Sequence, residues 1–83
     1  MAPRKPPQGR WPNIDWLVRG EGEITIGRIG PIRCAATAAD GHNALAMLVR
    51  QPRESLDELL SRLDEAIRIA VEQDVYTDEI NPS

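Results

Sequence analysis

Residues 55–71, SLDELLSRLDEAIRIAV, are the stretch that decides the fold of this chain. Ser55 followed by Glu58 three positions later is a capping box, in which two side chains satisfy free N–H groups at the start of a helix. Apolar side chains then recur at a spacing of three and four over about five turns: Leu56, Leu59, Leu60, Leu63, Ala66, Ile67, Ala70 and Val71. We therefore predict an amphipathic helix whose apolar stripe must be covered by another part of the chain.

The segment before this helix has the short-period patterns of strands. Three runs are expected to be strands, at residues 23–29, 32–39 and 44–50. Two turn sequences separate them, Gly30-Pro31 and Asp40-Gly41. Gly27 is expected to form a bulge that resets the register of its strand. One face of the second strand carries small side chains that let a helix approach closely: Ile32, Cys34, Ala36 and Ala38.

The predicted fold class is therefore α+β. A three-stranded antiparallel meander packs against one C-terminal amphipathic helix in the order β-β-β-α. Ile14, Trp16 and Val18 also alternate with other residues. Residues 14–18 then form either a fourth strand of the meander or the entry of the chain into the fold.

The chain has 83 residues, which is the size of one small domain. We expect a flexible, basic, Pro-rich arm at residues 1–13, an α+β domain at 14–73 and an acidic tail at 74–83. The chain has two Trp, one Tyr, no Phe and one Cys, so its core is thin and has no internal disulfide. Self-association is therefore expected to contribute to stability.

The single Cys and the absence of a basic-then-apolar N-terminus favour a reducing, cytoplasmic location. No apolar run reaches the roughly 18 residues needed to cross a bilayer, so no membrane contact is expected.

Catalytic and cofactor chemistry finds no support in the sequence. One Cys and one His are too few for a zinc site within one chain, and the glycines do not form a phosphate-binding loop. Cys34 and His42 could meet across the hairpin as nucleophile and base. We interpret Cys34 instead as a small core residue and His42 as a solvated turn residue. The sequence thus predicts no enzyme activity, no cofactor and no metal site.

The net charge of −3 is the sum of two unequal parts. Residues 1–53 carry eight basic and four acidic groups, a net charge of +4, whereas residues 54–83 carry two basic and nine acidic groups, a net charge of −7. Such a split is typical of an interaction surface. It is also explained if the two parts attract one another within the monomer or across a dimer.

The first functional hypothesis is a small non-catalytic binding or regulatory module that acts through protein–protein contacts as a homodimer. The thin core, the amphipathic helix and the charge split favour it. Ile69 stands on the charged face of the helix as a candidate second contact, beside three acidic residues: Glu58, Glu65 and Glu72. The protein partner is left open.

A second hypothesis is nucleic-acid binding through the basic sheet face and the N-terminal arm. Trp11 or Trp16 would stack on bases, and four arginines would contact phosphates: Arg19, Arg28, Arg33 and Arg50. The overall acidity of the chain opposes this role.

A third hypothesis is that the helix inhibits a basic partner or imitates a phosphate backbone. Glu58, Glu65 and Glu72 follow one another at seven-residue spacing and form a nearly linear stripe. The same stripe is typical of any solvated helical face.

Three segments resemble those of short bacterial proteins of unknown function found in accessory or mobile-element regions: ITIGRIGPIR at 24–33, AMLVRQPRESLDELLSRLDEAI at 46–67 and DEINP at 78–82. The β-β-β-α order followed by SLDELLSRLDEAI also resembles antitoxin domains of the HicB kind. That resemblance implies binding of a small toxin or of operator DNA. The chain departs from that family in lacking its Pro-Gly loop and fourth-strand pairing, so no functional residue is transferred.

Overall fold

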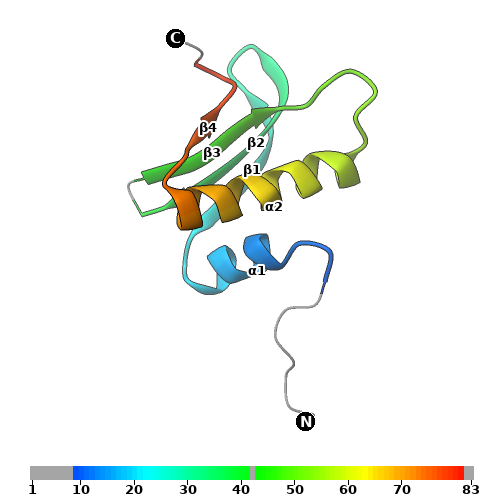
Figure 1. Ribbon diagram of the computed structural model, residues 1–83. Coiled ribbons are helices and arrows are strands. Elements are labelled where there is room, and N and C mark those ends of the chain that lie inside the picture. The colour runs from blue at the N-terminus through cyan, green and yellow to red at the C-terminus, as the bar shows by residue number, and fades with distance from the viewer. Residues whose placement is uncertain (1–8, 42, 82–83) are drawn as a thin grey trace.

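The computed structural model describes residues 9–41 and 43–81. In chain order its elements are α1 (Pro12–Arg19), β1 (Glu23–Ile29), β2 (Ile32–Asp40), β3 (Asn43–Val49), α2 (Leu56–Gln73) and β4 (Thr77–Asp78). The strands form one sheet in the order β1-β2-β3-β4, and α2 lies across one face of it with α1 beside α2 (Figure 1). The predicted α+β class and the packing of the C-terminal helix on the meander are confirmed.

The first three strands form the predicted antiparallel meander. Gly30 and Gly41 have φ angles of 56° and 63° in the two turns, which is the left-handed region that glycine enters at low cost. The register shifts between Gly27 and Ile29, but the extra residue lies on β2, where Arg33 and Cys34 oppose Arg28, and not on the strand of Gly27. A second shift places Leu45 as an extra residue in β3, and Leu45 and the following Ala46 are both buried.

The fourth strand is not residues 14–18. Those residues belong to α1, and the added strand is β4, which pairs in parallel with β3 and makes the sheet mixed. An eight-residue segment fits both a two-residue and a 3.6-residue repeat, and here the helix is favoured by Pro12 at its start and by burial of Leu17.

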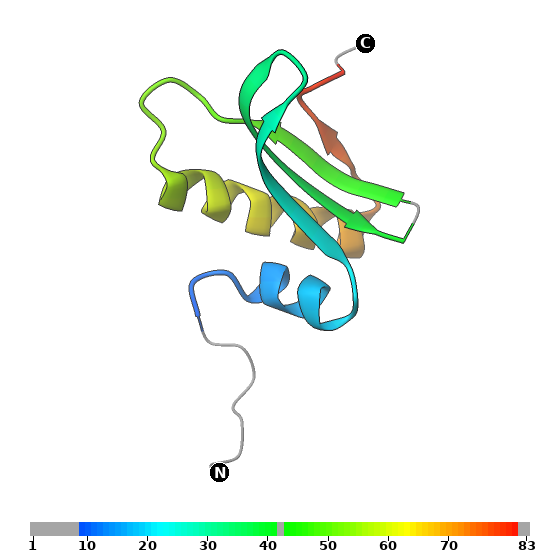
Figure 2. The same ribbon diagram turned by 180° about the vertical axis from the view of Figure 1, so that it is seen from behind.

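The core lies between α2 and the sheet. Leu48, Leu59, Leu63 and Ile67 are at most 1% exposed, and Ala36 and Ala38 give α2 a shallow surface to pack on. The predicted stripe is covered only in its middle, because Leu56 and Val71 at its two ends are 45% and 48% exposed. The opposite face of the sheet carries no helix among the described residues (Figure 2).

Residues 1–8 of the predicted arm lie outside the described residues. The residues that follow contact α2. The Arg10 guanidinium donates to Asp57 at 2.7 and 2.9 Å, and Trp11 Nε1 donates to Ser61 Oγ at 3.2 Å. Within 9–41 and 43–81, no helix is both long and apolar enough to cross a membrane.

Candidate functional site

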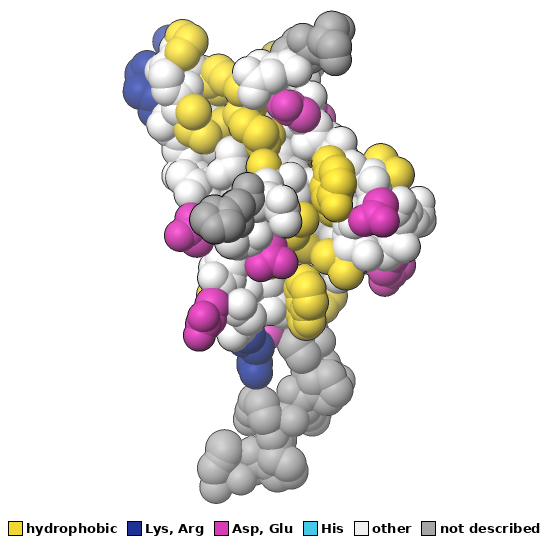
Figure 3. Space-filling view, turned by 90° about the vertical axis from the view of Figure 1, so that its left-hand side faces the viewer, with side chains coloured by type: hydrophobic (Ala, Val, Ile, Leu, Met, Phe, Trp, Pro, Cys, Tyr) yellow, Lys and Arg dark blue, Asp and Glu magenta, His cyan; other side chains and the backbone are white. Residues whose placement is uncertain are grey.

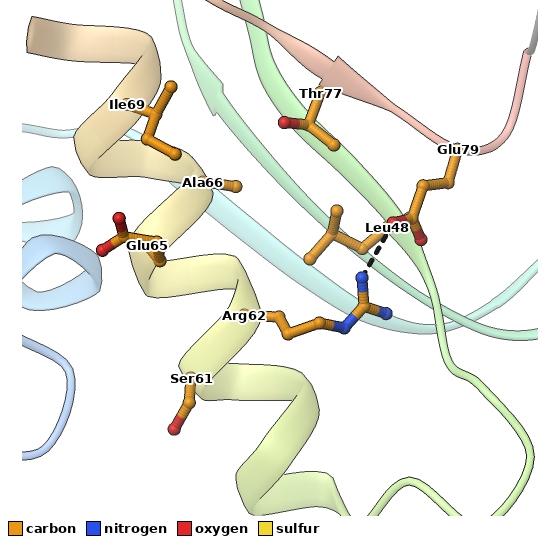
Figure 4. A pocket seen from close by; sticks show the side chains of 8 residues that line it. All are labelled: Leu48, Ser61, Arg62, Glu65, Ala66, Ile69, Thr77 and Glu79. Atoms are coloured by element: carbon orange, nitrogen blue, oxygen red, sulfur yellow. Dashed lines mark hydrogen bonds and ion pairs between the residues drawn. The ribbon is translucent and has the colours of Figure 1, made fainter.

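A hollow of about 400 Å3 lies between α2 and the C-terminal segment, and we call it the α2–β4 groove (Figure 4). It is lined by Leu48, Ser61, Arg62, Glu65, Ala66, Ile69, Thr77 and Glu79. Its apolar lining comes from three different elements: Leu48 from β3, Ala66 and Ile69 from α2, and Thr77 from β4. The groove therefore exists only because the C-terminal segment returns beside α2.

The groove is open because one of its walls is a very short strand and the other includes a small side chain. β4 has only two residues, so it does not cover the full length of β3. Ala66 contributes no more than a methyl group to the helix side, and Ile69 one turn further on is half-buried. Figure 4 shows Ile69 and Ala66 on α2, with Thr77 on the strand across from them. An apolar surface is thus accessible where another side chain would complete the packing.

A network centred on Arg62 closes one end of the groove. Its Nε donates to Glu54 Oε2 at 2.7 Å, and its Nη1 donates to Glu79 Oε2 at 2.8 Å. Its Nη2 also donates to the carbonyl of Val49 at 3.0 Å, while the N–H of Val49 donates to Glu79 Oε1 at 2.9 Å. The network therefore binds α2 to the outer edge of β3 and to the C-terminal segment.

The electrostatics of this network follow from its geometry. The hydrogen bond from Arg62 lowers the pKa of Glu54, whose side chain is only 8% exposed. The two carboxylates raise the pKa of Arg62 above its usual value, with Glu54 contributing most. Glu54 and Arg62 are therefore both charged at neutral pH.

Two acid–arginine combinations at i, i+4 spacing on α2 do not form ion pairs. Glu58 does not pair with Arg62, because its carboxylate accepts the N–H of Ser55 at 2.8 Å in the predicted capping box. Asp64 does not pair with Arg68, because it accepts the N–H groups of Asn13 and Ile14 at the start of α1. Both acids satisfy helix N-termini, where free N–H groups favour a carboxylate.

The predicted acidic stripe is partly neutralised by its own helix. Arg68 pairs with Glu65, and it donates to Glu72 at 2.8 Å. The hydrogen bond from Arg68 lowers the pKa of Glu65. Together with the use of Glu58 as a cap, this pairing leaves little of a free anionic line.

Ile69 does not lie on a charged face remote from the rest of the protein. It is half-buried and faces the α2–β4 groove together with Glu65. Ile69 has charged neighbours on α2, such as Glu65, but the position of the C-terminal segment decides what Ile69 faces. Nothing in the sequence of 74–81 indicated where that segment would dock.

The four predicted nucleic-acid arginines are only partly brought together. Arg28 and Arg33 occupy neighbouring strands at the Gly30 turn, and the N–H of Arg50 donates to the carbonyl of Cys34 beside them. Basic side chains gather at this end of the molecule (Figure 3). Arg19 lies on α1 instead, where it pairs with Asp15 at 2.7 Å.

The two candidate stacking residues differ in their surroundings. Trp16 is 53% exposed on α1, and Trp11 lies under the Arg10 guanidinium, with 5.2 Å between the guanidinium carbon and the ring centre. Neither Trp is part of the strand end that carries Arg28 and Arg33.

Cys34 is half-buried and packs against the core, whereas His42 lies outside the described residues. In the part of the chain that the structure describes, no three His, Cys, Asp or Glu side chains are grouped as metal ligands. The groove contains no pair of groups arranged as nucleophile and base, since its charged residues are held in ion pairs.

Comparison with known proteins adds no relative: the chain matches no family model, no curated protein and no solved structure.

Proposed function

We propose that this protein is a small non-catalytic binding module that acts as a homodimer, and that its α2–β4 groove receives an apolar side chain of a partner protein. The observation that carries the groove assignment is its lining, in which the partly exposed Ile69 and Thr77 border a floor formed by the buried residues Leu48 and Ala66. A hollow of about 400 Å3 is within the size range of pockets for small ligands, so it has room for one side chain. Such anchors supply most of the binding energy at many interfaces.

The polar rim indicates what should flank that side chain. Glu65 and Glu79 line the groove, and Asp78 lies on β4 next to it. Glu65 and Glu79 are already paired with Arg68 and Arg62, so the rim does not select a charge beside the anchor. We therefore expect the partner to present an aliphatic or aromatic residue flanked by polar side chains.

Ile69→Glu tests this proposal, because it places a charge on the groove wall at a half-buried position. A random peptide library is selected against the folded chain, and the affinities of the selected peptides are measured by fluorescence anisotropy. Loss of one buried apolar contact is worth about 1.5–3 kcal/mol, so affinity should fall roughly 10- to 150-fold.

Val18→Glu is the matched control, because Val18 is 52% exposed on α1 and does not line the groove. It should leave peptide affinity within about twofold. Peptides that bind the Ile69 and Val18 variants equally well, or that lack an apolar anchor, would refute the groove assignment.

The cluster formed by Arg28 and Arg33 on neighbouring strands at the Gly30 turn supports nucleic-acid binding as a second candidate function. Binding to a DNA or RNA oligonucleotide should then weaken steeply as salt rises. Arg33→Glu should abolish it, whereas Arg19→Glu, at an arginine remote from the cluster, should not. Binding that is insensitive to salt, or to Arg33→Glu, removes this candidate.

A further inference from the structure

We infer that a second copy of this chain pairs antiparallel with β1, so that the sheet continues from one copy into the other. This inference assigns a surface to the homodimer and rests on that part of the proposed function. It does not depend on what the α2–β4 groove binds.

The two edges of the sheet differ in whether other segments of the chain bind their backbone groups. On the β3 side, β4 pairs with Ala46 and Met47, and the N–H of Glu79 donates to the carbonyl of Met47 at 2.7 Å. Further along the same edge, the N–H and carbonyl of Val49 are satisfied by Glu79 and Arg62. On the other side, β1 is the outermost strand, and no described segment pairs with its free edge. An unpaired edge is a template for a further strand.

The side chains of β1 favour such pairing. Ile24 and Ile26 stand opposite Ala38 and Ala36, which face the core, so both isoleucines lie on the helix-covered face. Ile26 is nevertheless 41% exposed, because α2 does not extend over the outermost strand. The stretch from Ile24 to Gly27 is uncharged. A strand added beside it would cover apolar surface without burying a charge.

The charges at the two ends of β1 select a second copy as the occupant. Glu23 begins the strand and Arg28 lies near its end, and both are exposed. Antiparallel pairing of two identical strands brings the acidic end of each beside the basic end of the other. Parallel pairing would place like charges together. Antiparallel pairing centred on Thr25 sets Glu23 of one copy opposite Gly27 of the other, with Arg28 as the next residue.

Sedimentation equilibrium of the full chain tests the inference by charge exchange. Wild type should dimerise. Glu23→Arg and Arg28→Glu should each weaken the dimer about tenfold, since two unlike pairs become like pairs by symmetry. The double variant Glu23→Arg/Arg28→Glu should restore the wild-type dissociation constant to within about threefold. Glu21→Arg changes net charge equally outside β1, and it should have no more than a twofold effect.

Hydrogen exchange on wild type gives a second measurement that does not depend on folding of the variants. Amides of residues 23–27 should become more protected as protein concentration rises through the dimer range, whereas amides of α1 should not. A dimer that is unaffected by both single charge reversals, or that lacks this protection, overturns the β1 assignment alone. A wild-type monomer at high micromolar concentration overturns the homodimer as well and leaves the groove experiment unaffected.

Discussion

Asp64 is the acidic residue whose removal should reveal most about how this small fold is held together. It is 8% exposed on α2, and it accepts hydrogen bonds from the N–H groups of Asn13 and Ile14 at 2.7 and 2.8 Å. It also accepts one from Asn13 Nδ2 at 2.9 Å. The N-cap residue of α1, Trp11, makes no side-chain cap of its own. Asp64 therefore caps α1 from another helix.

Asp64→Ala should lower the free energy of unfolding by about 2–3 kcal/mol. A lost N-cap costs about 0.5–2 kcal/mol, and each hydrogen bond to a charged group is worth about 1.5–3 kcal/mol. Hydration of the freed N–H groups recovers part of this sum if the start of α1 separates from α2. A chain of this size has a total stability of only about 4–12 kcal/mol, so the loss should be conspicuous.

Urea unfolding measures the effect with two probes. Both tryptophans of the chain lie at α1, as Trp11 and Trp16, so fluorescence reports on α1. Far-UV circular dichroism is dominated by α2, which has 18 residues. With a slope of about 1 kcal/mol per molar urea, the urea midpoint of Asp64→Ala should fall by about 2–3 M. The fluorescence transition should come at the same urea concentration as the dichroism transition, or before it.

Asp57→Ala is the matched control, because Asp57 lies on the same helix and also binds the N-terminal segment, through Arg10. Its side chain is 59% exposed, so its loss should cost at most about 1 kcal/mol. If Asp64→Ala proves no more destabilising than Asp57→Ala, the capping of α1 by Asp64 does not stabilise the fold as argued here.

Two further predictions concern a close approach and an ion pair. Gly22→Ala should destabilise by about 1–3 kcal/mol in thermal melts, because its new methyl group would collide with the Leu17 side chain, whereas Gly9→Ala has open space and should be neutral. The pKa of Glu54 is lowered by Arg62. The contribution of ionised Glu54 to stability is therefore fully present above the ordinary glutamate pKa and is lost as pH falls through the lowered value. Glu54→Gln should remove this acid dependence, and urea midpoints measured between pH 3 and 6 would show it.

Local signals account for the parts of the fold that were predicted correctly. The capping box and the apolar stripe of α2 relate residues that are about one helical turn apart, and each glycine turn depends on a few neighbouring residues. By contrast, α1 depends on Asp64, about fifty positions away in the sequence. The segment also contains a helix pattern: Pro12 at the first helical position, Ile14 and Leu17 three residues apart, and Asp15 and Arg19 four residues apart. The two-residue alternation in the same segment favoured the strand interpretation instead.

The candidate groove could not be predicted from the sequence, because it also depends on residues that are distant in the chain. Ile69 was recognised as unusual, but its surroundings depend on a two-residue strand that is held by Met47 and by the Arg62 network. Arg62 in turn binds Glu54 and Glu79, which lie 8 and 17 positions away, and not Glu58 at the helical spacing. Pairing rules for isolated helices do not include such long-range partners.

Because charge is distributed unevenly over the molecule, the three proposed interactions should differ in how strongly their affinities depend on salt concentration. Of the described ion pairs, only that of Arg10 with Asp57 joins the basic part of the chain to the acidic part, while Arg62 and Arg68 each hold two carboxylates of the acidic part. The basic end at Arg28 and Arg33 therefore keeps its charge. An apolar anchor in the groove should bind almost independently of salt. Pairing of β1 edges should weaken modestly, because its exposed end charges are screened. Binding of nucleic acid should fall by orders of magnitude over the same range.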